Sequence, residues 1–255
     1  MSNPETALSQ GTYDDAANLG EDGHSAHKQS LAALTLGAIG VVYGDIGTSP
    51  LYAMREALRP VAQDGLERVE VLGVISLLIW TLILIVTIKY VLFLLRADNR
   101  GEGGILALYT LSRLAIGRRS YGVLALGIAG AALFFGDAVI TPAVSILSAV
   151  EGIELVAPSF EQYVIPVTIG IIVALFMVQQ HGTQAISVLF GPITAIWFIV
   201  MGITGARELA GDPAVLAAFN PVYGITFLAH HGFGAFFVMG AIFLAVTGAE
   251  ALYAD

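Results

Sequence analysis

Long apolar stretches constrain this chain more than any other feature of its sequence. A helix needs about 20 apolar residues to cross the hydrocarbon core of a bilayer. Six stretches reach or approach that length: 31–58, 70–95, 121–149, 162–179, 185–207 and 235–253. Only 12% of the residues are charged, against about 25% in soluble domains. We therefore predict an all-α polytopic membrane protein, with a transmembrane domain over residues 31–255.

Two segments outside the six stretches differ from them in composition. Residues 1–30 carry five acidic side chains and one lysine, which predicts a disordered acidic tail. Such a tail repels nucleic acid, so nucleic acid is excluded as a partner. Residues 98–117 are partly apolar but too short to span, and they predict a surface helix or loop.

The basic residues predict the orientation of the chain in its membrane. Five arginines lie between the second and third stretches: Arg96, Arg100, Arg113, Arg118 and Arg119. The next loop holds three glutamates and no basic residue. Basic loops stay in the cytoplasm, so residues 98–117 and the N-terminus are predicted to be cytoplasmic, in an inner or plasma membrane.

Three acidic residues lie well inside apolar stretches: Asp45, Asp137 and Glu250. A charged side chain there costs about 3 kcal/mol on insertion scales, so it normally faces a cavity or a partner. Burial disfavours the charged form of a carboxyl group, whereas a bound cation favours it. Each carboxyl group is therefore a candidate for exchanging a proton for a metal cation. The alternative is a structural hydrogen bond between two helices.

The first stretch is interrupted at 41–50 by the sequence VVYGDIGTSP. Gly44, Gly47 and Pro50 predict unwound backbone, which is tolerated at membrane depth only where it meets protein or a watery cavity. Freed carbonyl groups would form an oxygen cage for a monovalent cation, together with three side chains: Tyr43, Asp45 and Thr48. A phosphate-binding loop is excluded because its lysine is missing.

The third stretch carries a polar stripe. Asp137, Thr141, Ser145 and Ser148 are spaced to share one face of a helix. Small residues earlier in this stretch, Gly127 among them, would let a neighbouring helix come close. The stripe predicts the lining of a cavity, and the alternative is a polar seam that joins two helices.

The sixth stretch has an interruption of its own. Thr247 and Gly248 precede Glu250, much as glycine and threonine surround Asp45 in the first stretch. Paired interruptions in corresponding helices of two inverted repeats indicate the binding site of a transporter. We therefore expect inverted five-helix repeats, with broken helices 1 and 6.

Five sequence blocks resemble the signature motifs of the KUP/HAK/KT potassium transporters, in the same order. They are GVVYGDIGTSPLY (40–52), KYVLFLLRADNRGEGGILAL (89–108), GDAVITPAVSILSAVEG (136–152), QQHGT (179–183) and TGAEALYAD (247–255). The resemblance implies the twelve-helix fold of the amino acid–polyamine–cation superfamily. It also implies potassium uptake by symport with protons, with no enzymatic activity and no cofactor. Because helices seven onward are absent, we expect this chain to be a fragment of a longer protein.

The resemblance also assigns roles to residues. Asp45, Asp137 and Glu250 match the family's functional acidic positions, although many bacterial members have glutamate in place of Asp137. The expected ion-site oxygens are those of Tyr43, Thr48, Thr141 and Thr247. The expected potassium ligands are Asp45, Thr141 and Thr247. The implied partners are the potassium ion, the proton and membrane lipid, with a homodimer as the candidate assembly.

Three other functions compete with this interpretation. An amino acid permease of the same fold would offer free backbone N–H groups to a substrate carboxylate, which Asp45 would repel. An intramembrane aspartyl protease could use two aspartates as an acid and base pair. The local sequences Tyr43-Gly44-Asp45 and Phe135-Gly136-Asp137 lack the motifs of such enzymes. A passive channel is the third, and titratable acids suit coupled transport better.

Overall fold

The structure is a computed structural model that describes residues 31–62, 65–97, 99, 102–116, 121–179 and 184–254. The chain divides into two compact units, residues 1–35 and residues 36–255. The predicted acidic tail, 1–30, lies outside the described residues, as do parts of the motifs at 89–108 and 179–183. Within the described part of the chain the regular structure is helical, apart from one isolated bridge between Asn99 and Glu102.

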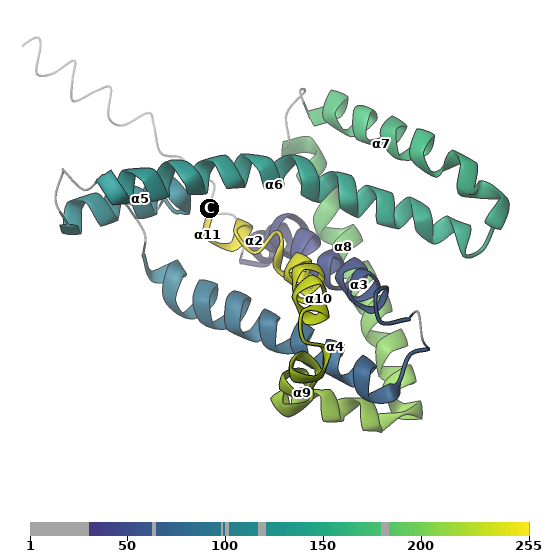
Figure 1. The fold of residues 1–255 in the computed structure, drawn as a ribbon. Helices are drawn as coiled ribbons and strands as arrows, with labels where there is room; N and C mark the ends of the chain where they lie inside the picture. Colours follow the sequence, from purple (N-terminus) through teal and green to yellow (C-terminus); the bar gives the residue numbers. More distant parts are fainter. Residues whose placement is uncertain are drawn as a thin grey trace, which may run out of the picture. The chain divides into compact units, whose positions relative to one another are not determined.

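The helical elements follow one another along the chain, with π-helical and 3-10 segments joining several of them (Figure 1). In order they are α2 (Leu31–Ala38), the π-helical η1 (Ile39–Tyr43), α3 (Gly44–Leu58), α4 (Arg68–Thr81), the π-helical η3 (Leu82–Phe93), the 3-10 η4 (Leu94–Arg96), α5 (Gly104–Ile116), α6 (Tyr121–Glu154), the 3-10 η5 (Pro158–Tyr163), α7 (Val164–Gln179), α8 (Gln184–Gly211), the 3-10 η6 (Pro213–Phe219), α9 (Pro221–His231), α10 (Gly234–Phe243), the 3-10 η7 (Leu244–Val246) and α11 (Ala251–Ala254).

Five helices in the described residues are long and apolar enough to cross a membrane. They are Arg68–Arg96, Tyr121–Glu154, Pro158–Val178, Phe190–Gly211 and Gly234–Tyr253, and they correspond to the second to sixth predicted stretches. The first predicted stretch, 31–58, is helical but is not among these five. Large apolar side chains on the spans are exposed, for example Leu133 at 75% and Ile203 at 66%. These helices indicate a multi-pass membrane protein.

The predicted surface helix is present as α5, which is too short to be one of the five spans. It lies beside one end of α6, and α7 lies beside the other end (Figure 1). A Cβ atom added at Gly127 would lie 2.9 Å from the Tyr109 ring, and one at Gly130 would lie 3.4 Å from Ile105. The expectation that small residues of the third stretch admit a neighbouring helix is confirmed, and the neighbour is α5.

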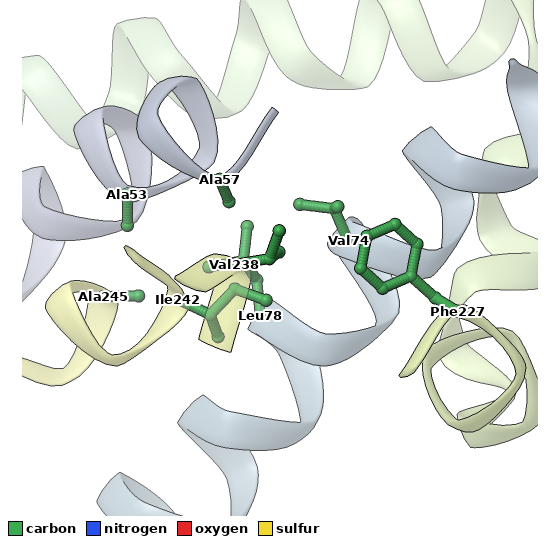
Figure 2. Packing of buried hydrophobic residues seen from close by; sticks show 8 residues of the cluster. All are labelled: Ala53, Ala57, Val74, Leu78, Phe227, Val238, Ile242 and Ala245. Atoms are coloured by element: carbon green, nitrogen blue, oxygen red, sulfur yellow. The ribbon is translucent and has the colours of Figure 1, made fainter. Parts of the chain in front are cut away.

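The main packed core joins α3, α4, α9 and α10 with η7. Figure 2 shows its buried side chains: Ala53, Ala57, Val74, Leu78, Phe227, Val238, Ile242 and Ala245. Two glycines let α4 and α9 approach closely, because a Cβ atom at Gly73 would lie 2.7 Å from Phe227 and one at Gly224 would lie 3.0 Å from Leu77. In lipid, such close packing replaces hydrophobic burial as the force that holds helices together.

The prediction of unwound backbone at residues 44–50 is wrong. Gly44 begins the α-helix α3, which contains Pro50, and the irregular turn is the π-helical η1 just before it. The glycines serve packing against α8 instead. A Cβ atom at Gly44 would lie 3.3 Å from the Thr194 hydroxyl, and one at Gly47 would lie 2.5 Å from Phe198. The glycines of α3 therefore leave one face of the helix without side chains, and the helix continues through them without a break.

The closest of these approaches predicts an effect on stability. A Cβ atom at Gly40 would overlap the backbone of Gly191 on α8, which cannot move aside as a side chain can. We expect Gly40→Ala to destabilise the protein by about 1–3 kcal/mol through overpacking. The measurement is the thermal unfolding of the protein purified in detergent. The matched control is Gly202→Ala on α8, where the described residues leave space for a Cβ atom. Equal effects from the two substitutions would contradict the packing role.

Candidate functional site

The sixth span is interrupted where the sequence predicts it. The helix ends with η7 at Val246, and Thr247 has extended backbone, with φ −62° and ψ 142°. Gly248 has a φ of +85°, in the left-handed region that glycine adopts without a steric penalty. The chain then re-enters a helix at Ala251. We call residues 247–250 the span-six break.

The span-six break lies directly against Asp45 of α3. A Cβ atom at Gly248 would lie 2.5 Å from the Asp45 carboxylate oxygen Oδ2 and 2.7 Å from its Cγ atom. Glycine is therefore required at position 248 for two independent reasons, the backbone conformation and the space that the carboxylate occupies. The contact brings the two predicted interruptions together, although the one in the first span remains helical.

The three intramembrane carboxyl groups converge at this break. Glu250 lies within hydrogen-bonding reach of Asp137, and both lie near enough to Asp45 to interact with it electrostatically. All three side chains are partly buried. A hydrogen bond between two carboxyl groups needs a proton on one of them. A proton on one of the groups would reduce the repulsion among the three acidic side chains.

The predicted hydroxyl residues lie at different distances from the carboxyl groups. Thr141 is buried and donates a 2.8 Å hydrogen bond to Oδ1 of Asp137, one turn away on α6. Thr48 donates instead to the backbone carbonyl of Asp45, at 3.1 Å. Tyr43 is 46% exposed, at the end of η1. The structure thus brings Thr141 into the site by its side chain, and Thr48 only through the Asp45 backbone.

A hydroxyl cluster ties the span-six break to the first span. The Tyr52 hydroxyl lies 3.0 Å from both Ser49 Oγ and Thr247 Oγ1, and these two oxygens are 3.2 Å apart. Thr247 also donates a 2.7 Å hydrogen bond to the carbonyl of Leu244. Sequence reasoning did not assign a site role to Ser49 or Tyr52. Their spacing could have indicated such a role, because Ser49 and Tyr52 lie four and seven residues after Asp45 and so share its helix face.

One hydroxyl on the predicted stripe of α6 has unused hydrogen-bonding capacity. Ser145 Oγ is buried, and it has no hydrogen-bond partner within the described residues. Buried polar atoms are nearly always paired with protein, water or an ion. Ser145 follows Thr141 by one turn on the face that begins at Asp137. It was predicted as a member of the stripe but not named as a site residue.

The arrangement limits how a metal ion could be held. In the part of the chain that the structure describes, no group of three or more acidic or histidine side chains is placed to hold a metal ion. A cation at this site would therefore need hydroxyl and backbone carbonyl oxygens in addition to the carboxylates. Such mixed oxygen ligands suit a monovalent cation that exchanges its water shell for protein oxygens.

The comparisons with known proteins agree with the motifs. Residues 32–255 match a family model described as the K+ potassium transporter integral membrane domain. The chain is 63% identical over 223 residues to the probable potassium transport system protein Kup 2 of Sinorhizobium medicae, covering 88% of this chain and 35% of that protein. It is 54% identical over 252 residues to the Kup protein of Brucella suis, covering 98% and 39%. The chain thus spans little more than a third of the length of these relatives. No solved structure matches it.

The hydroxyl cluster generates a prediction about stability. Tyr52→Phe removes the hydroxyl that joins Ser49 to Thr247 and leaves the ring in place. We expect it to lower the free energy of unfolding by about 0.5–1.5 kcal/mol, because Ser49 and Thr247 each lose one of their hydrogen bonds. Thermal unfolding in detergent measures this. The control is Tyr43→Phe, at an exposed ring, and an equally small effect from both would contradict the role of the cluster.

Proposed function

Because the chain belongs to the family of K+ potassium transporter integral membrane domains, we propose that it forms part of a protein that takes up potassium by symport with protons. The observation that carries this proposal is the convergence of Asp45, Asp137 and Glu250 at the span-six break. Carboxyl groups held close together at membrane depth are suited to holding a cation on one group and a proton on another. The relatives are named as probable potassium transport proteins, which supports potassium as the cation.

We assign the potassium ligands to Asp45, Thr141 and Thr247. The Asp45 carboxylate faces the break. The carbonyl oxygens of residues 247–250 each accept one hydrogen bond, and each keeps a second lone pair that a cation can use. Thr141 is held beside Asp137, and Thr247 is held by the hydroxyl cluster. Hydroxyl, carbonyl and carboxylate oxygens together would replace the water shell of K+.

We assign the coupling proton to the Asp137 and Glu250 pair. The two groups are within hydrogen-bonding reach of each other, so a single proton can be shared between them. In symport the two ions are carried together, with K+ at Asp45 and the shared proton on the pair. The proton removes one negative charge from the pair and so lowers the repulsion among the three acidic groups while K+ is bound. Occupancy by K+ and by the proton would thus be linked through the electrostatic interaction of three side chains.

We also propose the membrane, the orientation and the assembly of the protein. The protein would lie in the inner or plasma membrane with its N-terminus in the cytoplasm, in contact with lipid and in a candidate homodimer. The arginine-rich segment between the second and third spans supports this orientation. Contact between Asp45 and the span-six break supports inverted repeats whose first helices meet at the site. The irregular turn of helix 1 in that arrangement would be η1.

The competing functions receive no support from the comparisons, in which the matched relatives are named for potassium transport. An amino acid permease would need the break to attract a substrate carboxylate. Asp45 lies against the break and would repel one. A protease would use two aspartates, and the third acidic residue, Glu250, has no place in that mechanism.

The assignment of Asp45 predicts a loss of uptake. Asp45→Asn keeps the size of the side chain and removes its charge, so the affinity for K+ should fall at least about tenfold, equivalent to about 1.4 kcal/mol of binding free energy. The measurement is growth and K+ uptake at limiting external potassium, in a cell that lacks its own uptake systems, with the protein expressed from its complete gene. Asp212→Asn, at an exposed ion pair with Arg68, is the matched control. Near-normal uptake by Asp45→Asn would contradict the assignment.

Proton coupling predicts a dependence on external pH. Protonated carboxyl groups become more abundant as pH falls, so uptake should speed up between about pH 7 and about pH 5 and should acidify the cytosol. At pH values at which the coupling acid is mostly deprotonated, the proton-loaded form of the transporter becomes scarce and uptake should slow. Flux in reconstituted vesicles with and without a pH gradient measures this. Flux that is indifferent to the gradient would indicate a uniporter or channel.

A further inference from the structure

A short ion pair joins the far ends of the two helices that carry the site aspartates. The Arg55 Nη1 atom lies 2.6 Å from Glu151 Oε2, and the two side chains are 48% and 28% exposed. Arg55 is in α3 and Glu151 is in α6, 96 positions later in the chain. The pair takes no part in the carboxyl cluster. It lies ten residues beyond Asp45 on α3 and fourteen residues beyond Asp137 on α6.

Both helices present polar side chains between the carboxyl cluster and this ion pair. On α6 the stripe continues from Asp137 to Glu151 at spacings that keep one helix face, through Thr141, Ser145 and Ser148. On α3, Ser49 and Tyr52 occupy the face of Asp45, and Arg55 follows one turn after Tyr52. At 1.5 Å of rise per residue, the ion pair lies about 15–21 Å from the carboxyl groups along the helix axes. The helices α3 and α6 are in contact.

The chemistry of these stripes suits the passage of a cation. The hydroxyl groups of the α3 stripe, Ser49 and Tyr52, are bonded to Thr247, so the α6 stripe carries the argument. Its members between the two charged ends are hydroxyl groups, and Ser145 Oγ is buried without a partner among the described residues. Such an oxygen can bind a partly dehydrated cation. At the outer end, Glu151 attracts a cation only while its charge is not neutralised by Arg55. A second ion pair between distant segments, Arg68 with Asp212 at 2.7 Å, joins α4 to the start of η6 and lies on neither stripe.

We propose that Arg55 and Glu151 form the mouth of a cation path between α3 and α6, which is closed while their ion pair is formed. The identity of the cation as K+ rests on the proposed function, whereas the mouth itself rests on the ion pair and the stripes. When the pair separates, the Glu151 carboxylate is free to recruit the cation, which then meets the hydroxyl groups leading to Asp137 and Asp45. A half-exposed ion pair shifts an equilibrium by only about fivefold, which suits a contact that opens and closes in each cycle.

Accessibility of a cysteine on the stripe tests this proposal. The 255 residues contain no cysteine, so Ser148→Cys introduces the only thiol among them. The test uses the protein expressed from its complete gene, with any cysteine outside these residues replaced by serine. The probe is a trimethylammonium methanethiosulfonate, which is small, cationic and unable to cross a membrane, added on the side that Arg55 faces. We expect Arg55→Gln, which frees the Glu151 carboxylate, to speed labelling up to about fivefold. Glu151→Gln leaves the Arg55 charge alone at the mouth, where it repels the cationic probe, so it should not speed labelling. The exchanged pair Arg55→Glu with Glu151→Arg should restore the slow rate.

A control variant, and the outcomes that would overturn the proposal, distinguish a failure of the mouth from a failure of potassium symport. Asp212→Asn breaks the other ion pair and should leave the labelling rate unchanged. Equal rates in all variants, or the same acceleration by Asp212→Asn, would overturn the proposal. If Ser148→Cys fails to reach the membrane, Ser145→Cys, one turn nearer the site, takes its place. Labelling does not require transport, so a failure of potassium symport would leave the labelling pattern intact, and a failure of the mouth would leave uptake intact.

Discussion

The contact between Gly248 and the Asp45 carboxylate is the interaction on which the rest of the site depends. It is possible only because position 248 has no side chain and adopts a positive φ. The contact places the interrupted backbone of the sixth span against a charge in the first span. Glu250, two residues further on, is thereby brought to Asp137 of the third span. One close approach of backbone to carboxylate thus gathers three acidic groups from three separate spans.

Glycine has several roles in this protein, and they are separable. Gly248 shapes the backbone, whereas Gly40, Gly73 and Gly127 allow other elements to approach. Lipid solvates apolar side chains as well as a protein interior does, so helices in a membrane are held by close contact between their surfaces. Removing a side chain at the crossing point shortens the distance between helix axes and increases that contact. The glycine-rich segment of the first span therefore stays helical while packing closely on α8.

The polar side chains of the spans also lie close to one another. Few charged residues occur in the spans. Among them, Glu151 is paired with Arg55, and Asp137 lies beside Glu250. The hydroxyl groups of Ser49, Tyr52 and Thr247 satisfy one another around the span-six break, and they hold the first and sixth spans in register. Uncharged hydroxyl groups then extend along α6 toward Glu151. The charged groups thus mark the two ends of a seam that is otherwise lined by neutral oxygens.

The sequence by itself determined the membrane class, five of the six spans and the break at 247–250. Each of these depends on local composition: apolar length, the absence of charge, or a glycine beside a threonine. It also picked out the three acidic residues, because a charge at membrane depth is costly wherever it lies. The tertiary structure decided which of these residues meet. Sequence could not show that the glycines of the first span pack against α8, nor that Ser49 and Tyr52 hold Thr247. Both depend on contacts between residues roughly 150 to 200 positions apart, and such contacts are set by helix packing rather than by local pattern.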